Sequence, residues 1–276
     1  MLRITDLRLP LDHAEGDLRR AVLARLGIDD AALRGLTVFK RSHDARKKSA
    51  IQLIYTLDVE LADEAAVAAR LRGDAHVRPS PDTRYRFVGH APPDFRAGGR
   101  PRPLVVGFGP CGLFAALVLA QMGLAPIVLE RGRPVRQRTQ DTWGLWRRGV
   151  LDPASNVQFG EGGAGTFSDG KLWSQISDPR HLTRKVLTEF VKAGAPEEIL
   201  YVGKPHIGTF RLVSMIEKMR AESESLGGEI RFEQQVTDLS IEDGALRGVV
   251  LASGEQIDAE QLVLALGHSA RDTFAM

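Results

Sequence analysis

The sequence predicts an α/β protein in which a small α+β region precedes a larger region built on a parallel sheet. Residues 104–106 form an apolar segment that enters a glycine-rich turn, and an alanine-rich helix then leads to a second apolar segment at 125–129. A strand, a tight turn, a helix and a second parallel strand make a βαβ unit. After residue 229, short segments separated by turn residues predict an antiparallel meander, which returns to an apolar strand at 261–266.

The glycine-rich turn follows the Gly-x-Gly-x-x-Gly pattern that binds dinucleotides. In this pattern Gly107 makes the tight turn, Gly109 lets the backbone approach a diphosphate, and Gly112 packs the helix on the strand. Pro110 and Cys111 complete the predicted diphosphate site, and Cys111 is interpreted as a packing residue because no Cys-x-x-Cys motif surrounds it. The start of the helix carries a partial positive charge that suits a diphosphate.

An acidic residue, Glu130, ends the second apolar segment. At this position a carboxylate accepts hydrogen bonds from both hydroxyls of a nucleotide ribose, and each good bond to a charged acceptor contributes about 1.5–3 kcal/mol. A 2′-phosphate would meet a like charge there, so NADPH is disfavoured at this site. Arg131 follows directly and is a further candidate for cofactor binding.

A second glycine-rich loop spans residues 159–171. Its many glycines favour backbone that lies against a ligand, with a flexible lid as the alternative. Gly163 and Ala164 are predicted to contact the ligand through their backbone. Thr166, Ser168 and Lys171 are predicted to donate hydrogen bonds to it.

The meander distinguishes two kinds of dinucleotide domain. Its predicted strands are residues 239–241, 246–251 and 256–257. A nicotinamide-binding domain uses helical crossovers throughout, whereas a meander that leads to an apolar strand ending in Ala-x-Gly resembles the FAD domain of glutathione-reductase-like proteins. The resemblance implies that Glu130 holds the adenosine ribose, that the Val236 backbone meets the adenine, and that the chain turns at Gly267. Leu266 stands where this group usually has threonine.

A narrower resemblance covers nearly the whole chain. The segments that carry it are residues 39–48, 159–172, 204–209 and 267–272. Together they resemble the bacterial uncharacterised FAD-dependent dehydrogenases, also called NAD(P)/FAD-dependent oxidoreductases. Membership would imply FAD as the cofactor and transfer of hydride or electrons through the flavin. As a reductant, NAD(P)H is expected to bind transiently or on the missing part. The resemblance supplies neither a substrate nor catalytic residues. Lys171 is interpreted equally well as a flavin contact and as an ordinary loop residue.

Members of that family are longer, and their FAD domains close with a further strand and a Gly-Asp pair that does not follow Gly267 here. We therefore expect an N-terminal fragment. The predicted fold class is α/β: a Rossmann-like FAD-binding domain with a β-meander, incomplete at its C-terminus, preceded by a small α+β domain. The expected divisions are an α+β domain at 1–95, a linker at 96–102 and the truncated FAD domain at 103–276.

The N-terminal region contains a basic segment at residues 39–48. Because no RNA-recognition aromatics accompany it, a solvated loop is favoured and nucleic acid is disfavoured as a partner. Two alternative functions stay open: an RNA-associated flavoprotein and a non-catalytic dinucleotide-binding module. The RNA-binding residues would be Lys40, Arg41, Arg46, Lys47 and Lys48.

Composition excludes several classes of site and of targeting segment. The chain has 276 residues, a formal net charge of +2 and one cysteine, so neither an internal disulfide nor a cysteine-rich metal site is available. No metal-ligand spacing emerges, and no metal is expected. The first residues lack the apolar run of a signal peptide, and the apolar stretch 113–129 is interrupted by polar and turn residues. We expect a cytoplasmic protein without a membrane span.

Overall fold

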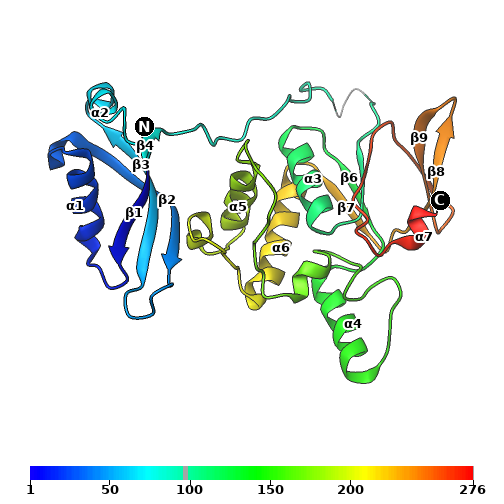
Figure 1. The fold of residues 1–276 in the computed structure, drawn as a ribbon. Helices are drawn as coiled ribbons and strands as arrows, with labels where there is room; N and C mark the ends of the chain where they lie inside the picture. The colour runs from blue at the N-terminus through cyan, green and yellow to red at the C-terminus, as the bar shows by residue number, and fades with distance from the viewer. Residues whose placement is uncertain (96–98, 276) are drawn as a thin grey trace. The chain divides into compact units, whose positions relative to one another are not determined.

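The computed structural model describes residues 1–95 and 99–275, which form two compact units (Figure 1). The first unit comprises Met1–Arg84, Leu172–Leu187 and Pro196–Pro205. The second unit comprises Tyr85–Lys171, Thr188–Ala195 and His206–Met276. The first unit thus ends before the expected boundary at residue 95 and takes in two later segments. Residues 96–98 of the expected linker, and Met276, lie outside the described residues.

The first unit is built on an antiparallel sheet with the strand order β2-β3-β1-β4. Its elements in chain order are β1 (Leu2–Pro10), α1 (Glu15–Leu26), β2 (Leu33–Asp44), β3 (Gln52–Leu61), α2 (Glu64–Arg70) and β4 (Val77–Pro79). This βαββαβ order, with β3 between β1 and β2, is the ferredoxin-like split βαβ arrangement. The predicted small α+β domain therefore has a defined topology, to which β2 and β4 add strands that the pattern analysis did not predict.

Alternation along the central strands explains how this sheet buries one face. Every second residue of β3 from Leu53 to Leu61 is buried. Val22 and Leu26 of α1 and Val67 of α2 belong to the same buried cluster, so both helices contribute to one core. Burying each such side chain contributes roughly 1.5–3 kcal/mol.

The edge strand β2 is paired by a later part of the chain. Arg41 in β2 forms an isolated parallel bridge with Val202. The N–H of Arg41 donates to the carbonyl of Tyr201 at 2.6 Å, and the N–H of Gly203 donates to the carbonyl of Arg41 at 2.7 Å. These bonds occupy backbone groups that an open sheet edge would leave unpaired.

The second unit is a Rossmann-like domain, as predicted. Its parallel sheet has the order β11-β5-β6-β7, and an antiparallel meander has the order β10-β9-β8. The sheet strands are β5 (Leu104–Val106), β6 (Ile127–Glu130), β7 (Glu229–Phe232) and β11 (Leu262–Leu264). The meander strands are β8 (Val236–Glu242), β9 (Ala245–Leu251) and β10 (Gln256–Asp258), of which β8 and β9 form the orange hairpin in Figure 1.

Helices complete this unit. Helix α3 (Pro110–Gln121) follows β5, and helix α6 (Thr209–Ser225) precedes β7. These two helices pack side by side (Figure 1). This unit also contains α4 (Val135–Arg148), η2 (Ala164–Phe167) and α7 (Arg271–Phe274). The short elements η1 (Asp30–Ala32) and η3 (Glu197–Leu200) belong to the first unit, and α5 (Leu182–Lys192) has residues in both. No helix within 1–95 or 99–275 has the length and apolarity needed to cross a membrane.

Candidate functional site

A cavity of about 390 Å³ lies in the second unit, where the parallel strands β5, β6 and β11 end. Ligands of open α/β sheets bind outside the carboxyl ends of the strands, and small-molecule sites have volumes of roughly 300–1,000 Å³. The predicted site residues that line this cavity are Gly107, Gly109, Pro110, Cys111, Glu130, Arg131, Gly163, Ala164, Val236 and Gly267. The fold thus gathers residues from five separate segments around one space.

The other predicted site residues are not part of this lining. Gly112 is buried in the packing of α3. Thr166 is 2% exposed, and its hydroxyl accepts a hydrogen bond from Arg138 at 3.2 Å. The Lys171 side chain is 77% exposed and pairs with Asp169 at 3.0 Å. The structure therefore does not bring the predicted donors Thr166 and Lys171 to the cavity.

The three glycines of the turn are under different structural constraints. Gly107 has a φ of 95°, and a Cβ there would lie 2.5 Å from the carbonyl oxygen of Ala265. A Cβ on Gly112 would overlap the carbonyl oxygen of Gly107. Gly109 has a φ of −73°, and a Cβ on it would meet its nearest atom, the Cα of Gly163, at 3.6 Å. The protein's own packing requires the first and third glycines but not Gly109.

The turn brings the N-terminus of α3 to the cavity. Gly109 is the N-cap of this 12-residue helix, and none of the described side chains caps it. Pro110 at the first helical position has no N–H, and the exposed Cys111 follows it. An uncapped helix start with its partial positive charge attracts an anionic ligand group.

Glu130 connects three loops around the cavity. It is 4% exposed. Its Oε2 accepts the N–H of Phe108 at 2.6 Å, and its Oε1 accepts the N–H groups of Gly132 and Gly160, each at 2.9 Å. A carboxylate has about four acceptor positions, so one is left, on Oε2. These three backbone bonds leave a single acceptor position for a ligand, and binding of a ribose by Glu130 stays a prediction.

A buried arginine supports the second glycine-rich loop. The side chain of Arg138 is fully buried, and its guanidinium donates to the carbonyl oxygens of Asn156, Val157 and Glu161 at 2.6–2.8 Å. Burial lowers the pKa of Arg138 to about 10, and the charges of Glu130 and Glu161 act in the opposite direction. The group stays protonated at neutral pH, and its hydrogen bonds hold the loop backbone in one conformation.

Glu161 belongs to the same loop, and its carboxylate is completely buried. Its Oε2 accepts the N–H of Val135 at 2.7 Å and Nη1 of Arg220 at 3.3 Å. Its Oε1 has no hydrogen-bond partner among the described residues. Burial raises the pKa of Glu161 above its ordinary value of 4.5, against the opposing effects of Val135 and Arg220.

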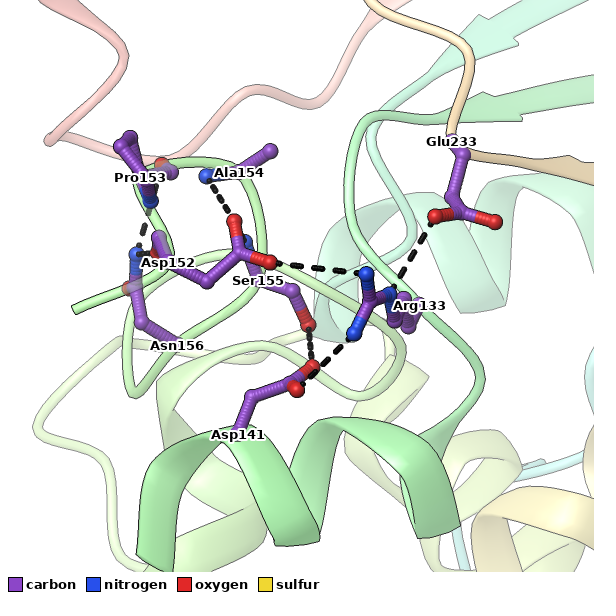
Figure 2. Close-up of polar contacts among 8 residues, drawn as sticks. All are labelled: Arg133, Asp141, Asp152, Pro153, Ala154, Ser155, Asn156 and Glu233. Atoms are coloured by element: carbon purple, nitrogen blue, oxygen red, sulfur yellow. Dashed lines mark hydrogen bonds and ion pairs between the residues drawn. The ribbon is translucent and has the colours of Figure 1, made fainter. Parts of the chain in front are cut away.

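An ion-pair network fixes the chain that leads into this loop (Figure 2). Arg133 donates to Asp141 at 3.0 Å and to Glu233 at 3.2 Å, and lies 3.7 Å from Asp152. Ser155 donates its hydroxyl to Asp141 at 2.6 Å. Because Glu233 precedes the cavity residue Gln234, Arg133 links two stretches of the cavity wall.

Sequence reasoning missed several lining residues. Among them are Gln158, Gln234, Ser269 and Thr273. It also missed the partner of Arg131, whose Nη2 lies 2.5 Å from Asp272 and whose guanidinium lies 4.5 Å from the Phe159 ring centroid. Asp272 is 141 positions from Arg131 in the sequence, and only the fold brings them together. In the described parts of the chain, no group of three or more His, Cys, Asp or Glu is placed to hold a metal ion.

Comparisons with known proteins found a family model that matches part of the chain and a similar protein of greater length. Residues 1–60 match a family model described as a domain of unknown function (DUF8436). An uncharacterized protein of Clostridium beijerinckii is 40% identical over 275 residues, which is 100% of this chain and 50% of the relative. The chain therefore spans about half the length of that relative.

Solved structures give weaker likenesses. Thermovibrio ammonificans THI4 is 19% identical with a TM-score of 0.40, over 64% of this chain and 61% of that one. A fructosyl amine:oxygen oxidoreductase of Aspergillus fumigatus is 17% identical with a TM-score of 0.38, over 63% and 50% of the two chains. A 3-ketosteroid dehydrogenase of Rhodococcus jostii is 14% identical with a TM-score of 0.37, over 60% and 48%. Likenesses this low do not determine a substrate for this chain.

Substitutions in the turn should separate packing from ligand contact. Gly112→Ala should lower the free energy of unfolding by about 2 kcal/mol or more, because the new Cβ overlaps backbone. Gly109→Ala should change it by no more than about 0.5 kcal/mol, because the Cβ makes only an ordinary van der Waals contact, 3.6 Å from the Cα of Gly163. Urea denaturation of both ligand-free variants measures the difference, and equal losses would contradict this division of tasks.

Glu130→Gln should destabilise the fold itself, whether or not a ligand is bound. The amide would turn an N–H₂ donor toward backbone N–H groups that now have a carboxylate acceptor, at a cost of about 2–4 kcal/mol. Urea denaturation is the measurement, and Glu255→Gln, at an exposed position, is the matched control. If both variants unfold at the wild-type midpoint, the three backbone bonds contribute nothing to stability.

Glu161 should make stability depend on pH in a specific direction. Its folded-state pKa is raised, so its contribution is fully present below about pH 4.5 and is lost as pH rises through the folded pKa. Glu161→Gln should therefore gain stability relative to wild type as pH rises. Glu217→Gln should show the opposite trend, because the hydrogen bond from Arg136 lowers the pKa of Glu217. Urea midpoints across the acid-to-neutral range measure both, and parallel trends would refute the assignment.

Proposed function

We propose that this chain carries the nucleotide-binding part of an FAD-dependent oxidoreductase. In this proposal the cavity at the ends of β5, β6 and β11 holds the adenosine and diphosphate of FAD. The flavin would accept hydride or electrons from a donor and pass them on. The support consists of the cavity, the helix start that faces it, and the meander that accompanies the parallel sheet.

One observation supports a bound nucleotide most directly. Gly109 lines the cavity, yet neither its backbone conformation nor any close protein atom requires glycine there. A ligand that lies against the backbone would require it, since a side chain would occupy the ligand's place. Gly107 and Gly112 do not support a ligand in this way, because packing alone accounts for them.

Each part of the site has a proposed task toward FAD. The N-terminus of α3 would bind the diphosphate, and the remaining acceptor position on Oε2 of Glu130 would take one ribose hydroxyl. Arg131 would add positive charge beside the nucleotide, and the backbone at Val236 would border the adenine. Lys171 would need to move to contact a flavin, since its side chain now pairs with Asp169.

In this proposal the complete reaction needs more than the present 276 residues. Because the chain spans 50% of its Clostridium beijerinckii relative, the substrate site and the electron donor are proposed to depend on sequence outside the present 276 residues. NAD(P)H is proposed as a transient reductant rather than as the occupant of the Glu130 site, and the proposed compartment is the cytoplasm.

The protein should be purified and its flavin content measured by absorbance and by mass spectrometry of the released nucleotide. FAD should be the nucleotide released, or should bind on titration. Gly109→Val should weaken FAD binding at least about tenfold, because its side chain would enter the diphosphate position. Gly16→Val is the control, since a Cβ there meets open space and the residue lies in α1 of the first unit.

Two results would count against the proposal. Wild-type protein that neither retains nor binds FAD would remove the cofactor assignment for this chain. Gly109→Val protein that keeps wild-type FAD affinity would place the diphosphate somewhere other than the turn.

A further inference from the structure

We propose that the end of α4 and the loop that follows it form a surface that docks on an anionic lipid bilayer. Large apolar side chains are 44–60% exposed there: Trp143, Trp146, Val150 and Leu151. All belong to the second unit, and none lines the cavity at the ends of β5, β6 and β11. Exposed apolar side chains gathered in one segment mark an interaction site.

The same segment is positively charged. Arg147 and Arg148 are exposed there, and residues 142–151 contain no aspartate or glutamate. Neither guanidinium forms an ion pair with a carboxylate among the described residues. Arg136, near the start of α4, pairs with Glu217 at 2.6 Å and so adds no net charge. We call the four apolar residues together with Arg147 and Arg148 the α4 surface.

The acidic residues that flank this surface are already engaged (Figure 2). Asp141 accepts the Ser155 hydroxyl at 2.6 Å and a guanidinium N–H of Arg133 at 3.0 Å. Asp152 accepts the N–H of Ala154 at 2.9 Å and lies 3.7 Å from Arg133. Both carboxylates thus serve the ion-pair network, and the charges of Arg147 and Arg148 stay free to attract an anionic partner.

Contacts within the unit hold both tryptophans in place. The guanidinium of Arg147 lies 3.9 Å from the centroid of the Trp143 ring. The Trp146 ring meets the Phe167 ring edge to face, with their centroids 5.7 Å apart. Because these rings are already ordered, docking costs less side-chain entropy. Helix α4 lies at the periphery of its unit, at the bottom of Figure 1.

A bilayer with anionic headgroups matches each component of the α4 surface. Tryptophan rings favour the boundary between headgroups and acyl chains, and Val150 and Leu151 add aliphatic surface that the acyl region would bury. Arg147 and Arg148 would meet the lipid phosphates. Each basic residue near an anionic membrane contributes roughly fivefold in affinity.

Two other partners match this surface less well. A symmetric contact with a second copy would bring Arg147 and Arg148 of one chain close to the same residues of the other, where like charges repel. Single-stranded RNA stacks its bases on free aromatic faces. The Arg147 guanidinium covers a face of Trp143, and Val150 and Leu151 have no ring to offer. We therefore assign a lipid surface.

Sedimentation of the full chain with lipid vesicles tests the assignment. Vesicles of phosphatidylcholine mixed with phosphatidylglycerol should bind it at least about tenfold more tightly than vesicles of phosphatidylcholine alone. Binding should weaken as salt is added, because salt screens the attraction.

Tryptophan fluorescence reports which part of the chain meets the lipid. The chain has three tryptophans, and Trp173 belongs to the first unit. Trp173→Phe protein should keep a shift of its emission to shorter wavelength on the anionic vesicles. The double variant Trp143→Phe and Trp146→Phe should lose that shift, since only Trp173 would then emit.

Matched variants separate the apolar and the charged contributions. Leu151→Ser should weaken vesicle binding several-fold, whereas Ile241→Ser should bind like wild type, because Ile241 has the same exposure, 59% against 58%, but lies on β8. Arg147→Gln combined with Arg148→Gln should weaken binding at least about tenfold. Arg211→Gln, at an exposed position of α6, is the charge control.

Several outcomes would overturn the proposal. These are no binding to the anionic vesicles, equal binding to phosphatidylcholine alone, or losses in the two controls as large as those in the α4 variants. Self-association that Leu151→Ser abolishes would replace the bilayer with a second copy of the chain. Binding of a uridine oligonucleotide that prevents vesicle binding and is lost in the arginine double variant would replace it with RNA.

Discussion

The second unit depends on one buried carboxylate that serves as the common acceptor for three loops. Glu130 accepts hydrogen bonds from the first glycine-rich turn, from the loop after its own strand and from the second glycine-rich loop. These segments are far apart in the sequence, and each presents a backbone N–H that would cost free energy if it were buried without a partner. A single side chain at the end of β6 thus joins three segments around the cavity. Arg138 and Arg133, which do not line the cavity, hold the neighbouring loop residues through their own hydrogen bonds.

Much of this fold could be predicted from local pattern. The glycine turn, the acid at the strand end and the meander each combine a hydrophobic period with turn residues at fixed offsets, and the structure has all three in place. β2 escaped prediction because its basic residues break the alternation, and its pairing with β3 depends on tertiary context. Local pattern also could not show that residues 172–187 and 196–205 belong with the first unit, because nothing in their own composition indicates a partner.

The candidate site shows the same division. Gly107, Gly109 and Glu130, which were named from the motif, line the cavity because the motif specifies backbone geometry. Thr166 was expected as a ligand donor from its residue type alone, but its hydroxyl bonds to Arg138 inside the protein. How many backbone N–H groups bind a carboxylate depends on how the loops fold. The sequence could therefore identify Glu130 but not the number of acceptor positions that it has left for a ligand.

The pairing of β2 with residues 201–203 has a consequence for how the protein is made. During synthesis on the ribosome, the strands of the ferredoxin-like sheet emerge long before Val202. In that interval the edge of β2 that later pairs with residues 201–203 is unpaired in the nascent chain. The rate of elongation through the intervening residues therefore sets how long that edge is open to pairing with a neighbouring nascent chain. A shortened gene product that stops before this segment would retain the bare edge permanently.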